Sequence, residues 1–292
     1  MTAADGLFVT TNADELRRAT AAARRQGKTV GCVPTMGALH AGHTSLIEAA
    51  RRETDFVVVT VFVNPSQFAP GEDLEAYPRP IEDDLKACRD AEVNVVFLPP
   101  TESLYPEGYS TWVDVEGLSR VLEGASRPTH FRGVATIVLK LLNIVGPDAA
   151  FFGTKDYQQL ALLRRMVRDL HVPVRLVPCP TVREPDGLAL SSRNVYLSSK
   201  ERKSALALHE SLRLAEERLL SGETDLPAIA TSMEQHLNSR PGVETDYAVI
   251  ADADTLEVLS APREQMVVLV AARVGKTRLI DNLPVTIPSQ SE

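Results

Sequence analysis

The sequence contains few cysteines, and their spacing does not indicate a disulfide framework or a metal site. Cys32, Cys88 and Cys179 are the three cysteines of the 292-residue chain. They are far apart in the sequence, odd in number and without the close spacing of metal ligands. We therefore expect reduced thiols and a cytoplasmic protein, because disulfides persist mainly in oxidising compartments.

Long apolar runs and an excess of basic residues are also missing. The longest strongly apolar run, Phe56 to Val63, is interrupted by Thr60 and is shorter than the roughly 20 residues that cross a bilayer. No basic segment leads into an apolar stretch at the N-terminus, so no cleaved signal is expected. With 39 acidic and 31 basic residues, the formal net charge is -8. A broad basic face for nucleic acid or for an anionic membrane is therefore excluded.

What the sequence does contain is short β-branched runs that alternate with stretches of helical period. This alternation is typical of an α/β fold with a Rossmann-like parallel sheet. The expected strands are Thr29–Val33, Phe56–Val63, Val93–Leu98, Ala149–Phe152 and Val174–Val177. The expected helices are Thr44–Arg52, Glu82–Asp90, Gly133–Val145 and Tyr157–Leu170.

The pattern changes after Pro180, which indicates a second domain. We predict a first, nucleotide-binding domain over residues 1–182 and a smaller C-terminal α+β lid domain over residues 183–292. The second domain is expected to contain a helix at Ser199–Leu220 and an antiparallel sheet of strands Thr245–Ile250, Met266–Val274 and Thr277–Asn282. The tail Pro284–Glu292 has little to bury, so we expect it to be disordered.

Two histidines follow the first expected strand and precede a helix, within the segment Val33–His43. Open α/β sheets bind ligands at the carboxyl ends of their strands, and a helix N-terminus attracts phosphate. Gly37 and Gly42 would let the backbone approach a ligand closely. His40 and His43 are placed to face one phosphate and to stabilise its charge during reaction. The segment therefore predicts a nucleotide site.

Other interpretations of this histidine pair are open at this point. Two histidines near a helix start are often surface residues. A zinc site is disfavoured because no cysteine or acidic ligand lies nearby in the sequence. The absence of a G-x-G-x-x-G motif disfavours ordinary NAD binding.

Polar residues also follow the second and fourth expected strands. Asn64 and Gln67 come after the second strand, and a glutamine amide suits a substrate with hydroxyl and carboxylate groups. Lys155 could pair with phosphates, and Asp156 could accept from ribose hydroxyls or assist a magnesium ion. The alternatives are an ordinary turn at Asn64-Pro65 and a surface Lys–Asp pair in which Asp156 caps a helix.

Two loops have groups that could bind anions. Ser191, Ser192 and Arg193 form a compact phosphate clamp in the segment that connects the two expected domains, although the same residues would also suit a helix-entry loop. His130 and Arg132 lie in another loop that enters a helix. For these two, ordering or neutralising the loop is favoured over direct catalysis.

The segment Pro34–His43 resembles the pantothenate synthetase form of the His-x-Gly-His signature. That signature belongs to the nucleotidyltransferase superfamily, which includes the class I aminoacyl-tRNA synthetases. The resemblance extends from about Val30 to Asn282. It implies an ATP-dependent ligase that condenses (R)-pantoate with β-alanine through pantoyl adenylate and releases AMP and pyrophosphate. Mg²⁺ would accompany ATP, and a homodimer is implied, for which hydrophobic strands of the first domain are the candidate interface.

The resemblance also implies site residues. The catalytic residues would be His43, as proton donor, together with His40, Lys155, Ser191, Ser192 and Arg193. The ATP site would contain Met36, Gly37, His40, Gly42, His43, Gly153, Lys155, Asp156, Val182, Leu190, Ser191, Ser192 and Arg193. The pantoate site would contain Gln67, Gln159, Asn64 and Tyr77. Thr154 departs from the usual glutamate and Leu190 from the usual methionine, while the metal ligands and the β-alanine subsite are unassigned.

Each alternative function would require different residues or a different activity. A nucleotidyltransferase acting on a phosphorylated substrate would call for added basic residues where Gln67 and Gln159 stand. An ATP-sensing protein would bind ATP without forming AMP. A tRNA-binding relative is disfavoured by the acidic composition, and a serine hydrolase by the absence of a G-x-S-x-G motif.

Overall fold

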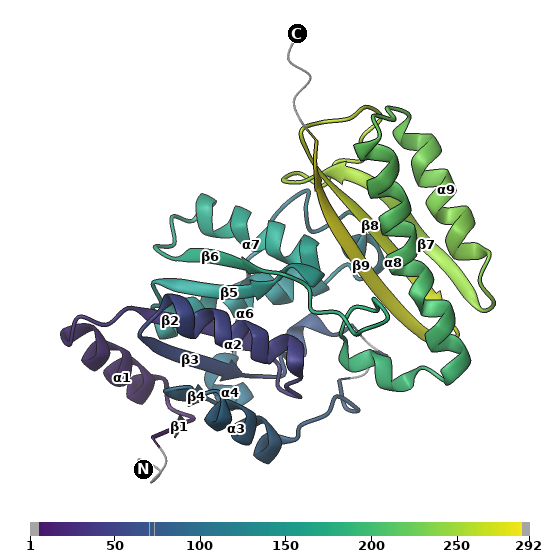
Figure 1. The fold of residues 1–292 in the computed structure, drawn as a ribbon. Helices are drawn as coiled ribbons and strands as arrows, with labels where there is room; N and C mark the ends of the chain where they lie inside the picture. The colour runs from purple at the N-terminus through teal and green to yellow at the C-terminus, as the bar shows by residue number, and fades with distance from the viewer. Residues whose placement is uncertain (1–5, 70, 73, 288–292) are drawn as a thin grey trace. The chain divides into compact units, whose positions relative to one another are not determined.

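The computed structural model describes residues 6–69, 71–72 and 74–287, which form two compact units (Figure 1). The first unit lies within Met1–Thr154 and Leu162–Pro180, and the second within Lys155–Ala161 and Thr181–Glu292. The chain therefore changes units close to the boundary expected between residues 182 and 183. The segment Lys155–Ala161 belongs with the second unit although it precedes that boundary.

The first unit is built on a six-stranded sheet in which all strand pairs are parallel. Its strands are β1 (Phe8–Thr10), β2 (Val30–Thr35), β3 (Phe56–Val61), β4 (Val95–Phe97), β5 (Ala149–Gly153) and β6 (Arg175–Cys179). The strand order is β1-β4-β3-β2-β5-β6. The chain moves from β2 outward through β3 to β4, and later returns to the other side of β2 at β5. This reversal makes the end of β2 a topological switch point, where open α/β sheets bind ligands.

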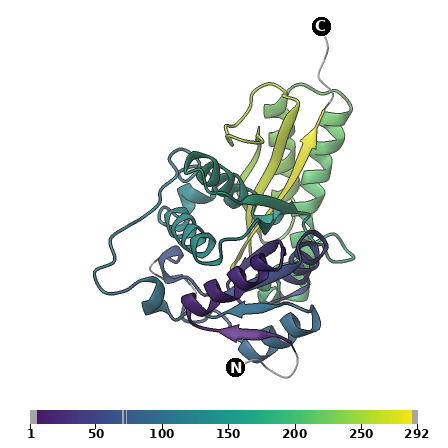
Figure 2. The same ribbon diagram turned by 90° about the vertical axis from the view of Figure 1, so that its left-hand side faces the viewer.

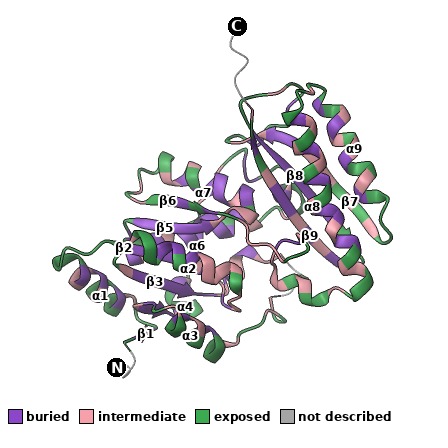
Figure 3. Ribbon diagram, in the orientation of Figure 1, coloured by how far each residue is buried: buried purple, intermediate pink, exposed green. Residues whose placement is uncertain are grey.

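Both faces of this sheet are covered. The helices are α1 (Ala13–Arg25), α2 (Ala41–Glu53), α3 (Ile81–Asp90), α4 (Thr101–Leu104), α5 (Glu123–Ser126), α6 (His130–Val145) and α7 (Tyr157–Asp169). On one face, Ile47 of α2 packs with Val33 and Val57 in a single apolar cluster. The side chains of Cys32 and Val58, on the same strands, point to the opposite face of the sheet and are fully buried as well. Figure 3 shows these strands in the buried colour, as expected for a parallel sheet.

The second unit contains a three-stranded antiparallel sheet packed against two helices. The strands β7 (Val243–Asp252), β8 (Gln265–Val274) and β9 (Thr277–Thr286) pair in the order β7-β8-β9. Figures 1 and 2 show α8 (Ser199–Leu220) running alongside this sheet, and α9 (Leu226–Asn238) packs on α8 and β7. Leu208 and Leu212 of α8 join Val268 and Val270 of β8 in one apolar core. The predicted fold class is confirmed in both parts.

Several element boundaries differ from the sequence-based expectation. The expected list lacked β1, α1, α4, α5 and α9. Helix α1 buries only Leu16, Thr20 and Ala23, and Leu16 is its one large apolar residue, so few apolar residues mark it in the sequence. The expected disorder from Pro284 onward is wrong for Pro284–Thr286, which belong to β9. Val285 pairs with Met266 of β8 and is buried, so a neighbouring strand orders this segment. Residues 288–292 of the expected tail lie outside the described residues.

The three cysteines are free and buried, which confirms the expectation of reduced thiols. Burial raises the pKa of Cys32 to about 12, and burial together with nearby Asp84 raises the pKa of Cys88 to about 12. These thiols are protonated at neutral pH and are not nucleophiles. In the part of the chain that the structure describes, none of the helices combines the length and apolarity needed to span a membrane.

Candidate active site

The first part of the candidate site lies where β2 ends and α2 begins. Helix α2 starts at Ala41, earlier than the expected Thr44, because His40 is its N-cap residue. His43 is therefore in the first turn of the helix and not in the preceding loop. Both histidines lie at a helix N-terminus, where the helix dipole favours negative charge.

Backbone hydrogen bonds fix both imidazole rings. The N–H of Gly42 donates to Nδ1 of His40 at 3.1 Å, and the N–H of His40 donates to Nδ1 of His43 at 3.4 Å. The ring centroids are 4.2 Å apart. Because Nδ1 is the acceptor in each ring, a neutral ring carries its proton on Nε2. The arrangement therefore prepares two Nε2–H groups as hydrogen-bond donors.

Gly42 is required by this geometry. A Cβ placed at Gly42 would lie 2.8 Å from Cε1 and 3.0 Å from Nδ1 of His40. Real Cβ contacts are longer, so any side chain at position 42 would displace the His40 ring. Gly42, which precedes His43, thus allows the observed position of the His40 ring.

The loop before His40 is held by Asp84 of α3, a residue that sequence analysis did not select. The buried Asp84 carboxylate accepts from the N–H of Ala38 at 2.9 Å and from the N–H of Leu39 at 2.7 Å. Gly37 and Ala38 both have positive φ, 82° and 51°. A non-glycine residue in this region is uncommon and has to be held in place by its surroundings. In sequence, Asp84 resembles any acidic residue in a first helical turn, so no local signal distinguished it.

Gln67 lies in the 3-10 helix η1 (Pro65–Gln67) after β3, and its amide is oriented by Asn64. Asn64 Nδ2 donates to Gln67 Oε1 at 3.0 Å, and Gln67 Nε2 points to Met36 Sδ at 3.0 Å. Both side chains are buried, and Asn64 is 1% exposed. The structure thus brings Asn64, Gln67 and Met36 together at the carboxyl edge of the sheet.

Asn64 is in turn held by two other elements. Its Nδ2 also donates to the carbonyl of Gly133 in α6 at 3.2 Å, and its Oδ1 accepts from the Tyr105 hydroxyl at 2.9 Å and the Ser66 hydroxyl at 2.9 Å. Gly133 permits this close packing, since a Cβ there would lie 2.4 Å from the carbonyl oxygen of Ser66. Tyr105 was not selected from the sequence, because a tyrosine far along the chain gives no local indication of this contact.

His130 and Arg132 lie in the first turn of α6 and not in the preceding loop, as the sequence had suggested. Together with Arg127, His130 supports the backbone of Gln67. His130 Nδ1 lies 3.0 Å from the Gln67 carbonyl oxygen, which can only accept, so Nδ1 carries the proton. Arg127 also donates to this carbonyl, at 3.3 Å, and forms an ion pair with Glu72 at 2.6 Å. Hydrogen bonds from Arg127 lower the pKa of Glu72. Arg132 instead lies over the ring of Trp112 at 4.7 Å. These contacts fit the ordering role that was favoured for His130 and Arg132 over direct catalysis.

Tyr77 is half-buried and packs edge-on against Phe68, with ring centroids 6.0 Å apart. Phe68 ends the 3-10 helix that contains Gln67. Tyr77 is therefore linked to the Gln67 turn through an aromatic contact.

The second unit contains the Lys155 segment. Lys155 and Asp156 lie in the 3-10 turn η2 (Thr154–Asp156), which directly follows Gly153 at the end of β5. Lys155 Nζ is 4.0 Å from Asp156 Oδ1, and the Asp156 side chain is 54% exposed. Gln159 is half-buried on α7. The Asp156 carboxylate is thus accessible to a ligand, and the Lys155 side chain beside it is partly exposed.

The loop from Val182 to Arg193 also belongs to the second unit. The N–H of Leu190 donates to the carbonyl of Val182 at 2.9 Å, which closes a tight hairpin. Ser191 then caps the short helix η3 (Ser192–Tyr196), accepting from the N–H of Arg193 at 3.3 Å. Ser191 and Ser192 are half-buried, and Arg193 is exposed.

Among the residues that the structure describes, no group of three or more His, Cys, Asp and Glu side chains is placed to hold a metal ion. Mg²⁺ differs from zinc because it often binds through one or two carboxylates together with substrate phosphates and water. The exposed Asp156 carboxylate beside Lys155 provides an oxygen donor of that kind. The donor set present therefore fits a phosphate-associated Mg²⁺ and not a metal held by protein groups alone.

The sequence model of the family described as pantoate-beta-alanine ligase matches residues 8–284. The chain belongs to the pantoate-beta-alanine ligase family. This result confirms the resemblance found in the sequence, and with it the expectation of a ligase. The match includes the histidine segment, the Gln67 turn, the Lys155 turn and the Ser191 loop.

Curated relatives in this family match nearly the whole chain. The chain is 51% identical to the pantothenate synthetase of Moorella thermoacetica over 268 residues, which are 92% of this chain and 95% of that protein. It is 52% identical to the pantothenate synthetase of Thermotoga neapolitana over 269 residues, 92% of this chain and 96% of the relative.

Solved structures of ligases in the family have the same fold. The crystal structure of pantothenate synthetase from Thermus thermophilus has a TM-score of 0.89 at 48% identity, covering 94% of this chain and 98% of that one. Pantoate-beta-alanine ligase from Francisella tularensis, complexed with beta-gamma ATP and beta-alanine, has a TM-score of 0.78 at 35% identity, covering 95% and 97%.

Proposed function

We propose that this chain condenses (R)-pantoate with β-alanine at the expense of ATP. A carboxylate oxygen of pantoate attacks the α-phosphorus of ATP, and the bond to pyrophosphate breaks. The amine of β-alanine then attacks the acyl carbon of pantoyl adenylate, loses a proton and displaces AMP. Membership of the family and the ATP and beta-alanine in the F. tularensis relative support this reaction.

The observation that carries the proposal is the pair of backbone-fixed imidazoles at the N-terminus of α2. Negative charge increases on the phosphates as pyrophosphate leaves, and donors fixed in advance stabilise that charge without reorganisation. His40 and His43 would each direct Nε2–H to the phosphates. For proton transfer, His43 would have to act from its imidazolium form, which gives its Nε2 proton to the leaving group and returns to the neutral ring.

The remaining ATP contacts would come from glycine-rich and cationic segments. Lys155, Ser191, Ser192 and Arg193 would share the phosphate charge with the histidines. The other proposed ATP-binding residues are Met36, Gly37, Gly42, Gly153, Asp156, Val182 and Leu190. Asp156 would hold Mg²⁺ together with the triphosphate, and the ion would neutralise phosphate charge.

Pantoate would be bound by amide groups, because it offers hydroxyl groups and one carboxylate. Gln67 would donate through Nε2, since Asn64 occupies its Oε1. Gln159 would provide the second amide, and Tyr77 would pack nearby. We propose that Asn64, which is buried and bonded on both sides of its amide, acts by orienting Gln67.

Pyrophosphate–ATP exchange tests the proposal. Exchange should require pantoate, and the complete mixture should yield pantothenate and AMP. His43→Ala should slow exchange about 10²-fold or more, as expected for the loss of a group that stabilises the transition state. His171→Ala, an exposed histidine of the same unit, is the matched control and should keep its activity.

Three outcomes would contradict the proposal. Exchange that proceeds equally well without pantoate would identify a different nucleotidyltransferase. ATP binding without AMP formation in the presence of both substrates would identify an ATP sensor. Full activity of His43→Ala would remove the proton donor from the mechanism.

We also propose a homodimer located in the cytoplasm. The family resemblance supports the dimer, and the three free cysteines are compatible with a reducing compartment. Sedimentation equilibrium would test the dimer, and a mass near the 31.8 kDa of one chain would contradict it.

A further inference from the structure

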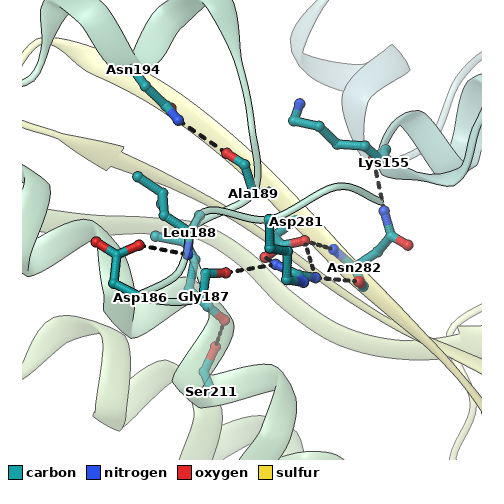
Figure 4. Close-up of polar contacts among 11 residues, drawn as sticks. Lys155, Asp186, Gly187, Leu188, Ala189, Asn194, Ser211, Asp281 and Asn282 are labelled. Carbon is teal, nitrogen blue, oxygen red and sulfur yellow. Dashed lines mark hydrogen bonds and ion pairs between the residues drawn. The ribbon is translucent and has the colours of Figure 1, made fainter. Parts of the chain in front are cut away.

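Two adjacent residues of β9, Asp281 and Asn282, connect the Lys155 turn to the start of the Val182–Arg193 loop. Both side chains are buried, with exposures of 4% and 3%. Figure 4 shows them at the centre of a set of polar contacts that includes Lys155 and Gly187. All of these residues belong to the second unit.

Asp281 occupies a position in β9 that packing alone would give to an apolar residue. Side chains alternate along a strand, and Leu279 and Val285 on the same alternation belong to the apolar core. Burying a carboxylate is costly unless it is paired. An apolar pair of similar volume often stabilises a protein at least as well as a buried ion pair. The carboxylate therefore points to a role other than stability.

Asp281 is paired with Arg183 through two hydrogen bonds. Arg183 Nη1 donates to Asp281 Oδ2 at 2.6 Å and Nη2 donates to Oδ1 at 2.9 Å. Arg183 Nη1 also donates to the carbonyl of Gly187 at 3.1 Å. The ion pair thus fixes both sides of the hairpin that leads to Ser191. A bidentate guanidinium–carboxylate pair fixes direction as well as distance.

On its other side, the hairpin is held by α8. Arg202 donates to both carboxylate oxygens of Glu184 at 3.1 and 2.9 Å and to Asp186 at 2.7 Å. Asn194 Nδ2 donates to the carbonyl of Ala189 at 3.1 Å. The Arg202 contacts fix the hairpin to α8, the Asn194 contact fixes it to η3, and Asp281 fixes it to the sheet.

Asn282 continues the connection toward Lys155. Its side-chain Nδ2 donates to the carbonyl of Lys155 at 2.7 Å, and its backbone N–H donates to Asp281 Oδ1 at 2.8 Å. One carboxylate oxygen of Asp281 thus accepts from both Arg183 and the Asn282 backbone. The Lys155 backbone and the hairpin are consequently held by neighbouring residues of a single strand.

We propose that Asp281 and Asn282 are positioning residues for the adenylation step. They fix the position of the Lys155 backbone relative to the hairpin that precedes Ser191-Ser192-Arg193. The cationic side chains and the serine hydroxyls of these two segments can then bind the same triphosphate. This inference rests on the proposed function, which places both segments at the phosphates. Both residues would act through the segments that they hold.

The two half-reactions separate this role from a merely structural one. Asn282→Ala and Asp281→Asn should slow pantoate-dependent pyrophosphate–ATP exchange by roughly 10- to 100-fold, the loss expected from misplaced groups. They should also raise the KM for ATP. The second step, measured with synthetic pantoyl adenylate and β-alanine, involves no pyrophosphate. Its rate should therefore fall by less than about threefold.

Matched controls come from the same unit. Asn238 accepts from the N–H and the hydroxyl of Thr245 through its side chain, and Asp246 pairs with Arg278 of β9. Asn238→Ala and Asp246→Asn should leave the rates of both half-reactions nearly unchanged. If Asn282→Ala lowered the rates of both half-reactions by the same factor, a smaller fraction of active enzyme would explain the loss. That result would overturn the proposal.

A double variant covers the case in which Asp281→Asn does not fold. Arg183→Met combined with Asp281→Leu removes the charges together and should fold with a Tm close to that of the wild type. We expect its exchange rate still to be reduced about 10-fold or more. Wild-type exchange in this variant would show that the ion pair has no positioning role. If the wild type itself lacks pantoate-dependent exchange, the proposed function fails instead.

Discussion

The hydroxyl of Tyr105 donates to Oδ1 of Asn64 across 2.9 Å, and Asn64 in turn donates to Oε1 of Gln67. Burial raises the pKa of Tyr105, so the phenol stays protonated at neutral pH and remains a donor. The tyrosine therefore determines which way the Asn64 amide faces. Through Asn64 it also determines that Gln67 presents an N–H to its surroundings.

Tyr105→Phe should raise the KM for pantoate by about fivefold, since one hydrogen bond contributes about 1 kcal/mol. The kcat should change less, because Ser66 still donates to Asn64 Oδ1. Steady-state kinetics with pantoate varied would measure both. Tyr109→Phe, which alters a neighbouring tyrosine of the same aromatic cluster, is the control, and an equal effect of the two variants would contradict this reasoning.

Gly42→Ala should reduce kcat roughly 10²-fold while leaving the fold intact. The added methyl would stand 2.8 Å from Cε1 of His40 and would rotate the imidazole away from its position, and small displacements of catalytic groups have effects of this size. Alanine favours a helix by about 1 kcal/mol over glycine, so the melting temperature should hold or rise. A fully active, stable Gly42→Ala enzyme would show that the His40 orientation is not needed.

The turn between β7 and β8 should make stability depend on acid pH. Asp252 accepts from the N–H groups of Asp254 and Thr255 and pairs with Arg263. These contacts lower its pKa from 3.8 to about 2. A lowered folded-state pKa stabilises the fold above the unfolded value, and this contribution is lost as pH falls through the folded value.

Asp252→Asn should therefore lower the melting temperature at neutral pH. The difference from the wild type should stay constant down to about pH 4 and then shrink as pH approaches 2. Thermal unfolding followed by circular dichroism at several pH values would measure this. A difference that grows toward acid pH would contradict the assignment.

The cysteines should react slowly with thiol reagents in the folded protein. Cys32 and Cys88 are 0% exposed, and their thiols have a pKa of about 12. A disulfide reagent such as dithionitrobenzoate requires an accessible thiolate. We expect labelling of the native protein to be at least about 10²-fold slower than in urea. Rapid labelling of the native enzyme would show that these sites open frequently.

Much of the fold follows from local sequence patterns. The runs around Val33, Val59 and Phe151 are apolar on both alternations, which is the pattern of a parallel strand covered on two faces. The segment after Val33 places glycines and histidines at a strand-to-helix junction, and this local pattern is sufficient to indicate a phosphate site. Helix α1 was not predicted because Leu16 is its one large apolar residue and alanines fill most of its other apolar positions, even though Asn12 caps it with two backbone hydrogen bonds.

The sequence by itself determined the fold class, the family and the residue types of the candidate site, because strand and helix periodicity and the histidine motif are local properties of the chain. Tertiary structure alone decided how those residues are held. The tautomers of His40 and His43 depend on which backbone N–H each ring meets. Asn282 meets the carbonyl of Lys155 across 127 residues of sequence. Contacts of this kind arise from the packing of strands and loops onto one another, and no local pattern encodes them.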